Sequence, residues 1–311
     1  MDYSREEEIR KAQKNIDDFL NSEAFQKIVE IFHHGEKLYD LDEINLLAEE
    51  WDYRRKIAQG GERQQITEED PFVAEHREEI IQSFRELGML YEKEIDFPAP
   101  DYILPLGGFG LSNLKRCLIA KKLSDAYRDK EIRIVGLSSH REILQQLEFE
   151  QIKDAFPAAK TEFEEMDASL RIAFDLNEVR SAKSYNEKDS REYWSILTYA
   201  SSDPLRRYHN LSAPCYDRKR TRPNTVDTFV HLLRCMNVRV GSKLILASTA
   251  LYGPYQMYSL LPTAIEYGVE LYFFGGDYKE RDEEILATLC LVDLKSAVNA
   301  MAAFRKKYPK E

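Results

Sequence analysis

The stretch from Tyr102 to Gly110, YILPLGGFG, passes from an apolar run directly into glycines, and an amphipathic helical pattern follows it through Leu123. Similar apolar runs that end near glycine, serine or threonine follow at residues 132–137, 194–200, 243–247 and 269–274. Unbroken apolar runs indicate strands buried on both faces, as in a parallel sheet covered by helices. The pattern therefore predicts a Rossmann-like, doubly wound α/β domain with a mainly parallel sheet over residues 98–311.

Residues 1–97 contain no such strand-like runs, and their pattern predicts an all-helical N-terminal lobe. Apolar residues recur there at helical spacing within residues 17–32, 41–57 and 71–90. Pro71 stands just inside the start of the last segment, with Asp70 as its expected N-cap. The run Pro98-Ala99-Pro100 marks the expected boundary with the α/β domain, and the last helix, at about residues 283–306, is expected to pack on a face of that domain.

The negative charge of the chain is concentrated in its first third. The 311 residues have a formal net charge of -11, and residues 1–100 contain 26 acidic and 13 basic residues, against 29 and 31 in the remainder. An acidic surface repels phosphate backbones, so nucleic-acid binding is not expected. The acidic helical lobe is instead the expected surface for a protein partner or for self-association.

Composition also predicts where the protein resides. The mean hydropathy is -0.53, and the sequence shows no apolar run of the roughly 20 residues that a membrane span needs. The first residues, MDYSREEEIRKAQK, are too charged for a secretory signal. The four cysteines are widely spaced without a CxxC pair, which argues against a metal site or a disulfide framework. A cytoplasmic protein without membrane contact is therefore expected.

Polar and glycine residues follow several of the expected strands, where doubly wound sheets bind their ligands. The predicted ligand contacts at these ends are Gly107, Gly108 and Gly110, then Ser138, Ser139 and Arg141, and finally Ser248 and Thr249. A single glycine turn is more often a packing device than a ligand site. Several such ends converge on one edge of a parallel sheet, where the N–H groups of the following helices favour an anion.

The densest cluster of cations, Arg218-Lys-Arg-Thr-Arg222, precedes an expected helix start at Pro223 with Asn224 or Thr225. A solvated loop is one interpretation, with Thr225 as N-cap and Asp227 complementing the helix dipole. Guanidinium groups beside open N–H groups also form a cradle for phosphate or carboxylate. The predicted ligand contacts here are Arg220, Arg222, Asn224, Thr225 and Thr228.

Glu162 is the first candidate for a catalytic role. Thr161 and Glu164 match a helix capping box, which explains Glu164 structurally, and Glu165 is expected to face solvent. Glu162 has no such structural assignment. It is therefore predicted to reach into the crevice as an acid, a base or an acceptor for a hydroxyl group.

Four further side chains are candidates for the same site. Asp227 could act as a base or bind ribose hydroxyls, and His140, at a strand end, could act as an acid or base near neutral pH. Tyr252 and Gln256 could provide a stacking face and an amide for a flat ligand, or could only pack a helix against the sheet. No metal site is expected.

The order of these motifs resembles the SanA/YdcF/ElyC-type family, which is of largely unknown function. The family pattern is a strand ending in Leu-Gly-Gly, a strand ending in Ser-Gly-Gly, then Ser-Glu-Ala-x-x-Met, Asn-Thr-x-Glu-Asn, and a strand followed by His-x-x-Arg. The corresponding segments lie within about residues 101–275: Leu106-Gly-Gly, Gly136-Leu-Ser-Ser-His140, Thr161-Glu-Phe-Glu-Glu-Met166, Pro223-Asn-Thr-Val-Asp-Thr228 and Ser248-Thr249.

This resemblance implicates Gly107, Gly108, Ser138, Ser139, Glu162, Asn224, Thr225 and Asp227. The chain departs from the pattern in three places: Ser138-Ser-His140 replaces Ser-Gly-Gly, Asp227-Thr228 replaces Glu-Asn, and Tyr252-Gly-Pro-Tyr-Gln256 stands where His-x-x-Arg is expected. The last departure removes the histidine and arginine and so concerns the reaction. The family implies a Rossmann-like fold and, for some members, nucleotide-type ligands such as S-adenosylmethionine. It does not supply a reaction.

Three functions are consistent with these observations. The first is an enzyme, a hydrolase or transferase of unresolved reaction, that binds a phosphate-bearing or nucleoside-type small molecule at the carboxyl edge of the sheet. The second is a non-catalytic metabolite sensor or scaffold. The third is an S-adenosylmethionine-binding protein or methyltransferase, against which the chain lacks a GxGxG loop after the first strand. No cofactor is assigned.

Overall fold

The computed structural model describes residues 4–56, 65–144, 148–185, 191–278 and 283–310. Contacts divide the chain into two compact units. The α/β unit contains Glu94–Ser248 and Thr263–Gly276, and the helical unit contains Ser4–Lys93, Thr249–Pro262 and Asp277–Glu311. The expected division into two domains at residue 97 therefore does not hold for the C-terminal part of the chain, because much of that part belongs to the same unit as the N-terminal helices.

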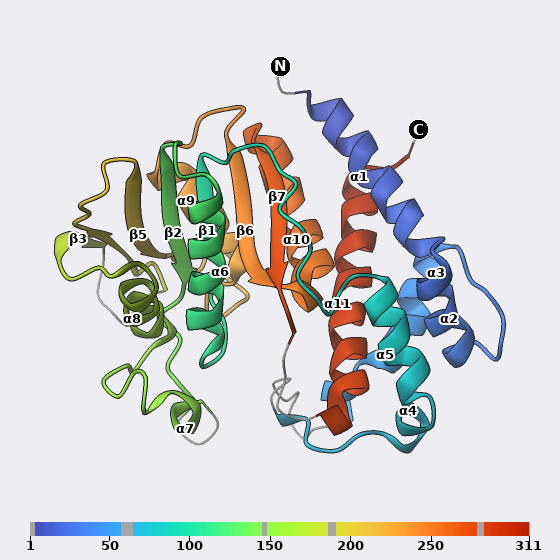
Figure 1. The fold of residues 1–311 in the computed structure, drawn as a ribbon. Coiled ribbons are helices and arrows are strands. Elements are labelled where there is room, and N and C mark those ends of the chain that lie inside the picture. Colours follow the sequence, from blue (N-terminus) through green and yellow to red (C-terminus); the bar gives the residue numbers. More distant parts are fainter. Residues whose placement is uncertain (1–3, 57–64, 145–147, 186–190, 279–282, 311) are drawn as a thin grey trace. The chain divides into compact units, whose positions relative to one another are not determined.

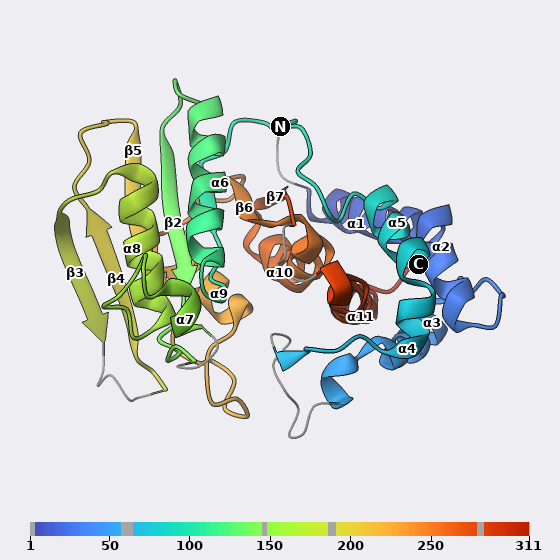
Figure 2. The same cartoon turned by 60° about the horizontal axis from the view of Figure 1, so that its bottom comes forward.

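The α/β unit is built on a seven-stranded sheet in the described residues. Its strands are β1 (Tyr102–Pro105), β2 (Ile132–Ser138), β3 (Val179–Tyr185), β4 (Trp194–Tyr199), β5 (Arg206–Ser212), β6 (Lys243–Thr249) and β7 (Glu270–Gly276). The strand order is β3-β4-β5-β2-β1-β6-β7. Strands β5, β2, β1 and β6 pair in parallel, whereas β4 pairs antiparallel with both β3 and β5. Figure 2 shows the opposite directions of β3 and β4. The predicted Rossmann-like α/β fold with a mainly parallel sheet is confirmed.

Burial explains which strands could be recognised from the sequence. All four residues of β1 are buried, and β2 and β6 are buried along almost their whole length. Strand β3, with the sequence VRSAKSY, exposes six of its seven residues. A polar edge strand leaves no apolar run in the sequence, so β3 was not predicted. β5, with the sequence RRYHNLS, has no apolar run either and was also not predicted.

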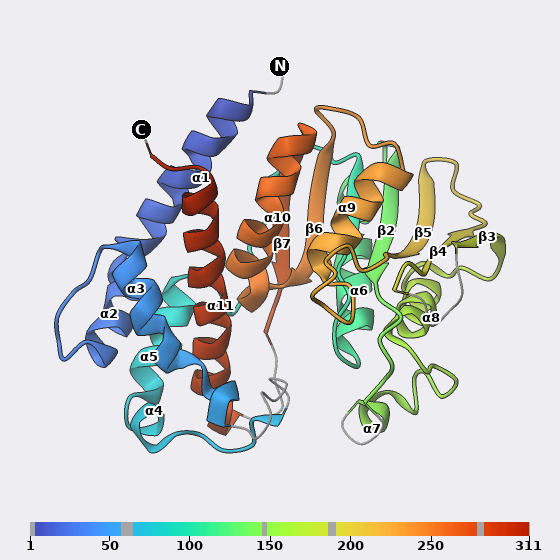
Figure 3. The same cartoon turned by 180° about the vertical axis from the view of Figure 1, so that it is seen from behind.

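Helices cover both faces of this sheet. In Figures 1 and 3, α6 (Ser112–Ala126) and α8 (Glu162–Phe174) lie on one face, and α9 (Thr225–Cys235) lies on the other. Helix α6 follows β1, α8 follows β2 and the short helix α7 (Phe149–Ile152), and α9 follows β5. The N-termini of these three helices consequently lie toward the carboxyl edge of the parallel strands, the edge at which the sequence predicts a ligand site.

In the described part of the N-terminal segment the regular elements are helices, as predicted, joined by loops. Its helices are α1 (Arg5–Leu20), α2 (Glu23–Phe32), α3 (Leu41–Leu47), α4 (Pro71–Glu75) and α5 (Arg77–Glu86), with 3-10 turns η1 (Ala48–Trp51) and η2 (Tyr53–Lys56). Asp70 caps α4 by accepting a hydrogen bond from the N–H of Phe72 at 3.0 Å, which confirms the predicted cap. The expected end of the second segment at residue 57 lies outside the described residues.

The C-terminal helix α11 (Leu286–Lys307) packs with α3, α5 and η1 inside the helical unit. The expectation that this helix belongs to the α/β domain therefore differs from the structure. Among the described residues, α11 is the one helix that is both long enough and apolar enough to cross a membrane. However, 72% of its most apolar stretch is buried within the fold. Helix α10 (Gly253–Tyr267) is divided between the two units.

Candidate functional site

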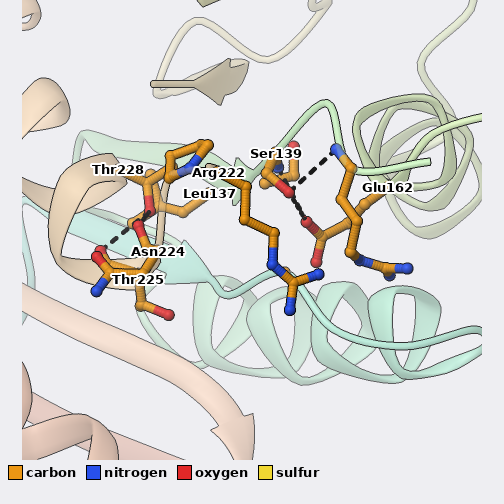
Figure 4. A pocket seen from close by; sticks show the side chains of 11 residues that line it. Leu137, Ser139, Glu162, Arg222, Asn224, Thr225 and Thr228 are labelled. Carbon is orange, nitrogen blue, oxygen red and sulfur yellow. Dashed lines mark hydrogen bonds between the residues drawn. The ribbon is translucent and has the colours of Figure 1, made fainter. Parts of the chain in front are cut away.

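A cavity of about 220 Å³ lies in the α/β unit at the carboxyl ends of β1 and β2. Its lining residues are Gly107, Leu137, Ser138, Ser139, Arg141, Glu162, Arg222, Pro223, Asn224, Thr225 and Thr228. They come from four segments that are far apart in the sequence: the loop after β1, the end of β2, the start of α8 and the start of α9. Half of the predicted site residues are thus brought together around one space, which Figure 4 shows from close by.

Glu162 is the acidic side chain of the cavity lining. Its Oε2 accepts a hydrogen bond from the N–H of Ser139 at 3.0 Å and a second from the Ser139 hydroxyl. Burial raises the pKa of Glu162, while the nearby guanidinium of Arg141 opposes that shift. A carboxyl group with a raised pKa can exchange a proton with a bound ligand closer to neutral pH than an ordinary glutamate.

The glycine loop after β1 does not offer its N–H groups to the cavity. The N–H groups of Gly107, Gly108 and Gly110 already donate, respectively, to Leu137 O (2.6 Å), Asn113 Oδ1 (2.9 Å) and Glu148 Oε1 (2.9 Å). The predicted ligand contacts of Gly107 and Gly108 are therefore not made through their N–H groups. Only Gly107 of the three lines the cavity, and its contribution is steric.

A Cβ at position 107 would lie 2.7 Å from Glu162 Oε1 and 2.8 Å from Leu137 O, because Glu162 packs directly against Gly107. We expect Gly107→Ala to lower the free energy of unfolding by about 1–3 kcal/mol, since one of these groups must move. Urea denaturation measures the change. Gly241→Ala is the control: a Cβ there meets nothing within 4 Å, so only the strain of its φ of +78° remains. A Gly107→Ala protein as stable as wild type would contradict this packing.

Arg141 lines the cavity beside Glu162, and a buried carboxylate outside the cavity lining fixes its side chain. Its guanidinium donates to both carboxylate oxygens of Glu148, at 2.6 and 2.8 Å. Glu148 is fully buried, and its oxygens also accept from the N–H groups of Gly110 and Leu144. Glu148 therefore fixes Arg141 and the glycine loop together, a role that its surrounding sequence does not indicate.

The N-terminus of α9 forms the opposite wall. Asn224, not Thr225, is the N-cap, and it forms a capping box with Asp227: Asn224 Oδ1 accepts from Asp227 N at 3.1 Å, and Asp227 Oδ2 accepts from Asn224 N at 2.8 Å. Arg220 donates to both oxygens of Asp227, at 2.7 and 3.1 Å. Arg220 and Asp227 thus neutralise one another outside the cavity lining, whereas Arg222 and Thr225 belong to it.

His140 lies next to the site in sequence but points elsewhere. Its ring packs between those of Phe163 and Tyr193, with centroid distances of 4.6 Å to each. Its Nε2 lies 2.7 Å from the hydroxyl oxygen of Ser195. His140 is not among the cavity's lining residues, so the structure gives it a packing role rather than the predicted proton shuttle.

The remaining predicted contacts lie away from the described cavity lining. Ser248 is fully buried at the end of β6, and Thr249, Tyr252 and Gln256 belong to the helical unit. Sequence analysis missed the apolar lining residues Leu137 and Pro223, as well as the buried carboxylates behind the wall. Glu165, expected to face solvent, is completely buried, so that expectation is wrong. Within the described residues, no group of histidine, cysteine or acidic side chains is arranged to hold a metal ion.

Comparison with known proteins identifies relatives over almost the full length. The chain is 24% identical to the uncharacterised protein Rv3785 of Mycobacterium tuberculosis and equally to the uncharacterised protein Mb3814 of Mycobacterium bovis, each over 94% of this chain and 89% of the relative. No family model and no solved structure matches the chain. These names assign no activity, and the resemblance to the SanA/YdcF/ElyC-type family stays a prediction.

Proposed function

We propose that the α/β unit binds a small phosphate-bearing molecule in this cavity, with Arg222 and the N-terminus of α9 contacting the phosphate. The observation that carries the proposal is the position of Arg222. In Figure 4 its side chain lies between Thr225 on one wall and Ser139 with Glu162 on the other. The first turn of a helix has N–H groups without intrahelical partners, and a guanidinium beside them completes a site for a phosphate oxygen.

The size and lining of the cavity favour a small ligand over a nucleoside. Its volume of about 220 Å³ is below the roughly 300–1,000 Å³ of pockets that enclose drug-sized ligands. No aromatic side chain is among the described residues that line it, so a nucleobase would find no stacking partner there. A phosphorylated sugar, polyol or acid of a few carbons fits this chemistry best.

Glu162 gives the proposed site its chemical capability. It stands across the cavity from the helix start, and its raised pKa suits it to hold or accept a proton at a ligand oxygen beside the phosphate. This role is that of a general acid or base in a hydrolase or transferase. Turnover of phosphorylated metabolites by the wild-type protein, abolished in Glu162→Gln, supports an enzyme. Binding of the same compounds without turnover supports the sensor.

The assignment of Arg222 is tested by binding. We expect Arg222→Ala to weaken the binding of inorganic phosphate by about 10-fold to 100-fold, since a charge-assisted hydrogen bond contributes about 1.5–3 kcal/mol. Isothermal titration calorimetry measures the affinity. Arg218→Ala is the matched control, because Arg218 is an exposed cation of the same loop that does not line the cavity. Equal losses in both variants would show general charge attraction, and no binding by wild type would contradict the proposal.

A further inference from the structure

Glu165 lies directly behind the cavity, one turn along α8 from Glu162. The residue is completely buried. Its Oε2 accepts a hydrogen bond from Asn113 Nδ2 at 2.8 Å, whereas its Oε1 has no hydrogen-bond partner among the described residues. A buried carboxylate oxygen without a donor is costly when the group is ionised, and the cost is far smaller when that oxygen carries a proton.

The neighbouring charges also favour a neutral Glu165. The charged groups that act on Glu165 are Glu148 before α7, Arg141 after β2 and Glu162 on its own helix, and Arg116 on α6 acts on the neighbouring Glu162. Arg141 is paired with Glu148, and Arg116, itself buried, donates to the carbonyl oxygens of Leu106 and Gly107. Three carboxyl groups therefore face two guanidinium groups, and a single proton balances the charge. Burial raises the pKa of Glu165 to about 8.

We propose that Glu165 carries a proton on Oε1 at neutral pH and acts as a positioning residue that keeps a further negative charge away from the floor of the anion cavity. This proposal rests on the proposed function, because it concerns the regulation of the same site. When Glu165 is neutral and Glu162 is ionised, the three carboxyl groups and two guanidinium groups named above have no net charge. Loss of the proton adds one buried negative charge behind the cavity and repels a bound anion.

The loss of the proton also affects the wall of the site. Asn113 donates to Glu165 from the same amide group whose Oδ1 accepts the N–H of Gly108 at 2.9 Å. Helix α6, α8 and the glycine loop are therefore connected through one amide. The protonation state of Glu165 is thus coupled both to the potential in the cavity and to the loop that closes its base.

Sulfate is the appropriate probe, because it remains a dianion from pH 6 to 9 whereas phosphate itself titrates. We expect the affinity of the wild-type protein for sulfate to fall about tenfold between pH 7 and pH 9, because one unit of negative charge is added to the buried groups behind the cavity. In Glu165→Gln, which keeps an acceptor for Asn113 and cannot ionise, the fall should be less than threefold. Glu150→Gln, an exposed glutamate of α7, is the matched control and should follow the wild type.

Infrared spectroscopy of the wild-type protein tests the proton without any ligand. A protonated carboxyl band that is lost on the Glu165→Gln substitution should be present in the wild type at pH 7 and disappear by pH 9. Glu165→Met replaces that variant if it does not fold. Absence of the band at pH 7, or sulfate affinity that falls equally in wild type and Glu165→Gln, overturns this inference and leaves the proposed function intact. Failure of sulfate to bind at any pH contradicts the proposed function, while the infrared band still decides the inference.

Discussion

Replacing Glu148 by alanine is expected to lower the free energy of unfolding by about 3–5 kcal/mol, because it leaves a mostly buried guanidinium without its partner. Glu148 is fully buried and Arg141 is 16% exposed. The carboxylate accepts two hydrogen bonds from Arg141 and one each from the N–H groups of Gly110 and Leu144. Removing the carboxylate leaves the guanidinium of Arg141 and two N–H groups without their acceptor, so the loop around the cavity is destabilised.

Urea denaturation of the variant measures this loss, and sulfate titration measures its effect on the site. Glu150→Ala is the matched control, because its side chain is 61% exposed and its ion pair with Lys153 lies at the surface; its stability should equal that of the wild type within error. The double variant Glu148→Ala/Arg141→Met should be more stable than Glu148→Ala alone, since no unpaired charge remains. If Glu148→Ala behaves like Glu150→Ala, Glu148 does not hold the wall of the cavity.

Sequence patterns identified the strands whose ends form the site. The apolar runs before Gly107 and Ser138 are central parallel strands. Because such strands are buried on both faces, they appear in the sequence as unbroken apolar runs. The polar strand β3 left no such signal. The capping box of Thr161 and Glu164 is recognisable from sequence, because capping depends on residue types three positions apart, whereas the capping box of Asn224 and Asp227 was not predicted. The N-cap of α9 was placed one residue too late, since Asn224 and Thr225 are both capable caps.

There is a physical reason why the buried carboxylates next to the cavity could not be predicted from the sequence. A glutamate in a polar stretch is normally solvated, and only the tertiary structure shows that Glu148 and Glu165 are buried. Glycines are equally ambiguous: Gly107, Gly108 and Gly110 were predicted to contact a ligand, but hydrogen bonds within the protein occupy their N–H groups. Whether a donor is free depends on partners such as Asn113, whose proximity a sequence does not reveal.

Asp227 shows how a predicted catalytic carboxylate can turn out to be a structural one. Asp227 is 3% exposed and lies outside the cavity lining, where it accepts two hydrogen bonds from Arg220 and one from the N–H of Asn224. Its three bonds hold the basic loop against the start of α9. The position of Arg222, two residues after Arg220, depends on this attachment.

We therefore expect Asp227→Ala to lower the free energy of unfolding by about 2–4 kcal/mol, because the capping box is lost and Arg220 loses its buried partner. Sulfate binding should weaken in parallel as the loop detaches. Asp217→Ala is the matched control: Asp217 is 46% exposed and contacts the same arginine at 3.2 Å, so its loss should leave stability unchanged within error. A double-mutant cycle with Arg220→Met should give a coupling energy of about 1–3 kcal/mol for Arg220 and Asp227. If Asp227→Ala is as stable as wild type but abolishes turnover of a phosphorylated substrate, Asp227 acts on the substrate and the structural role is wrong.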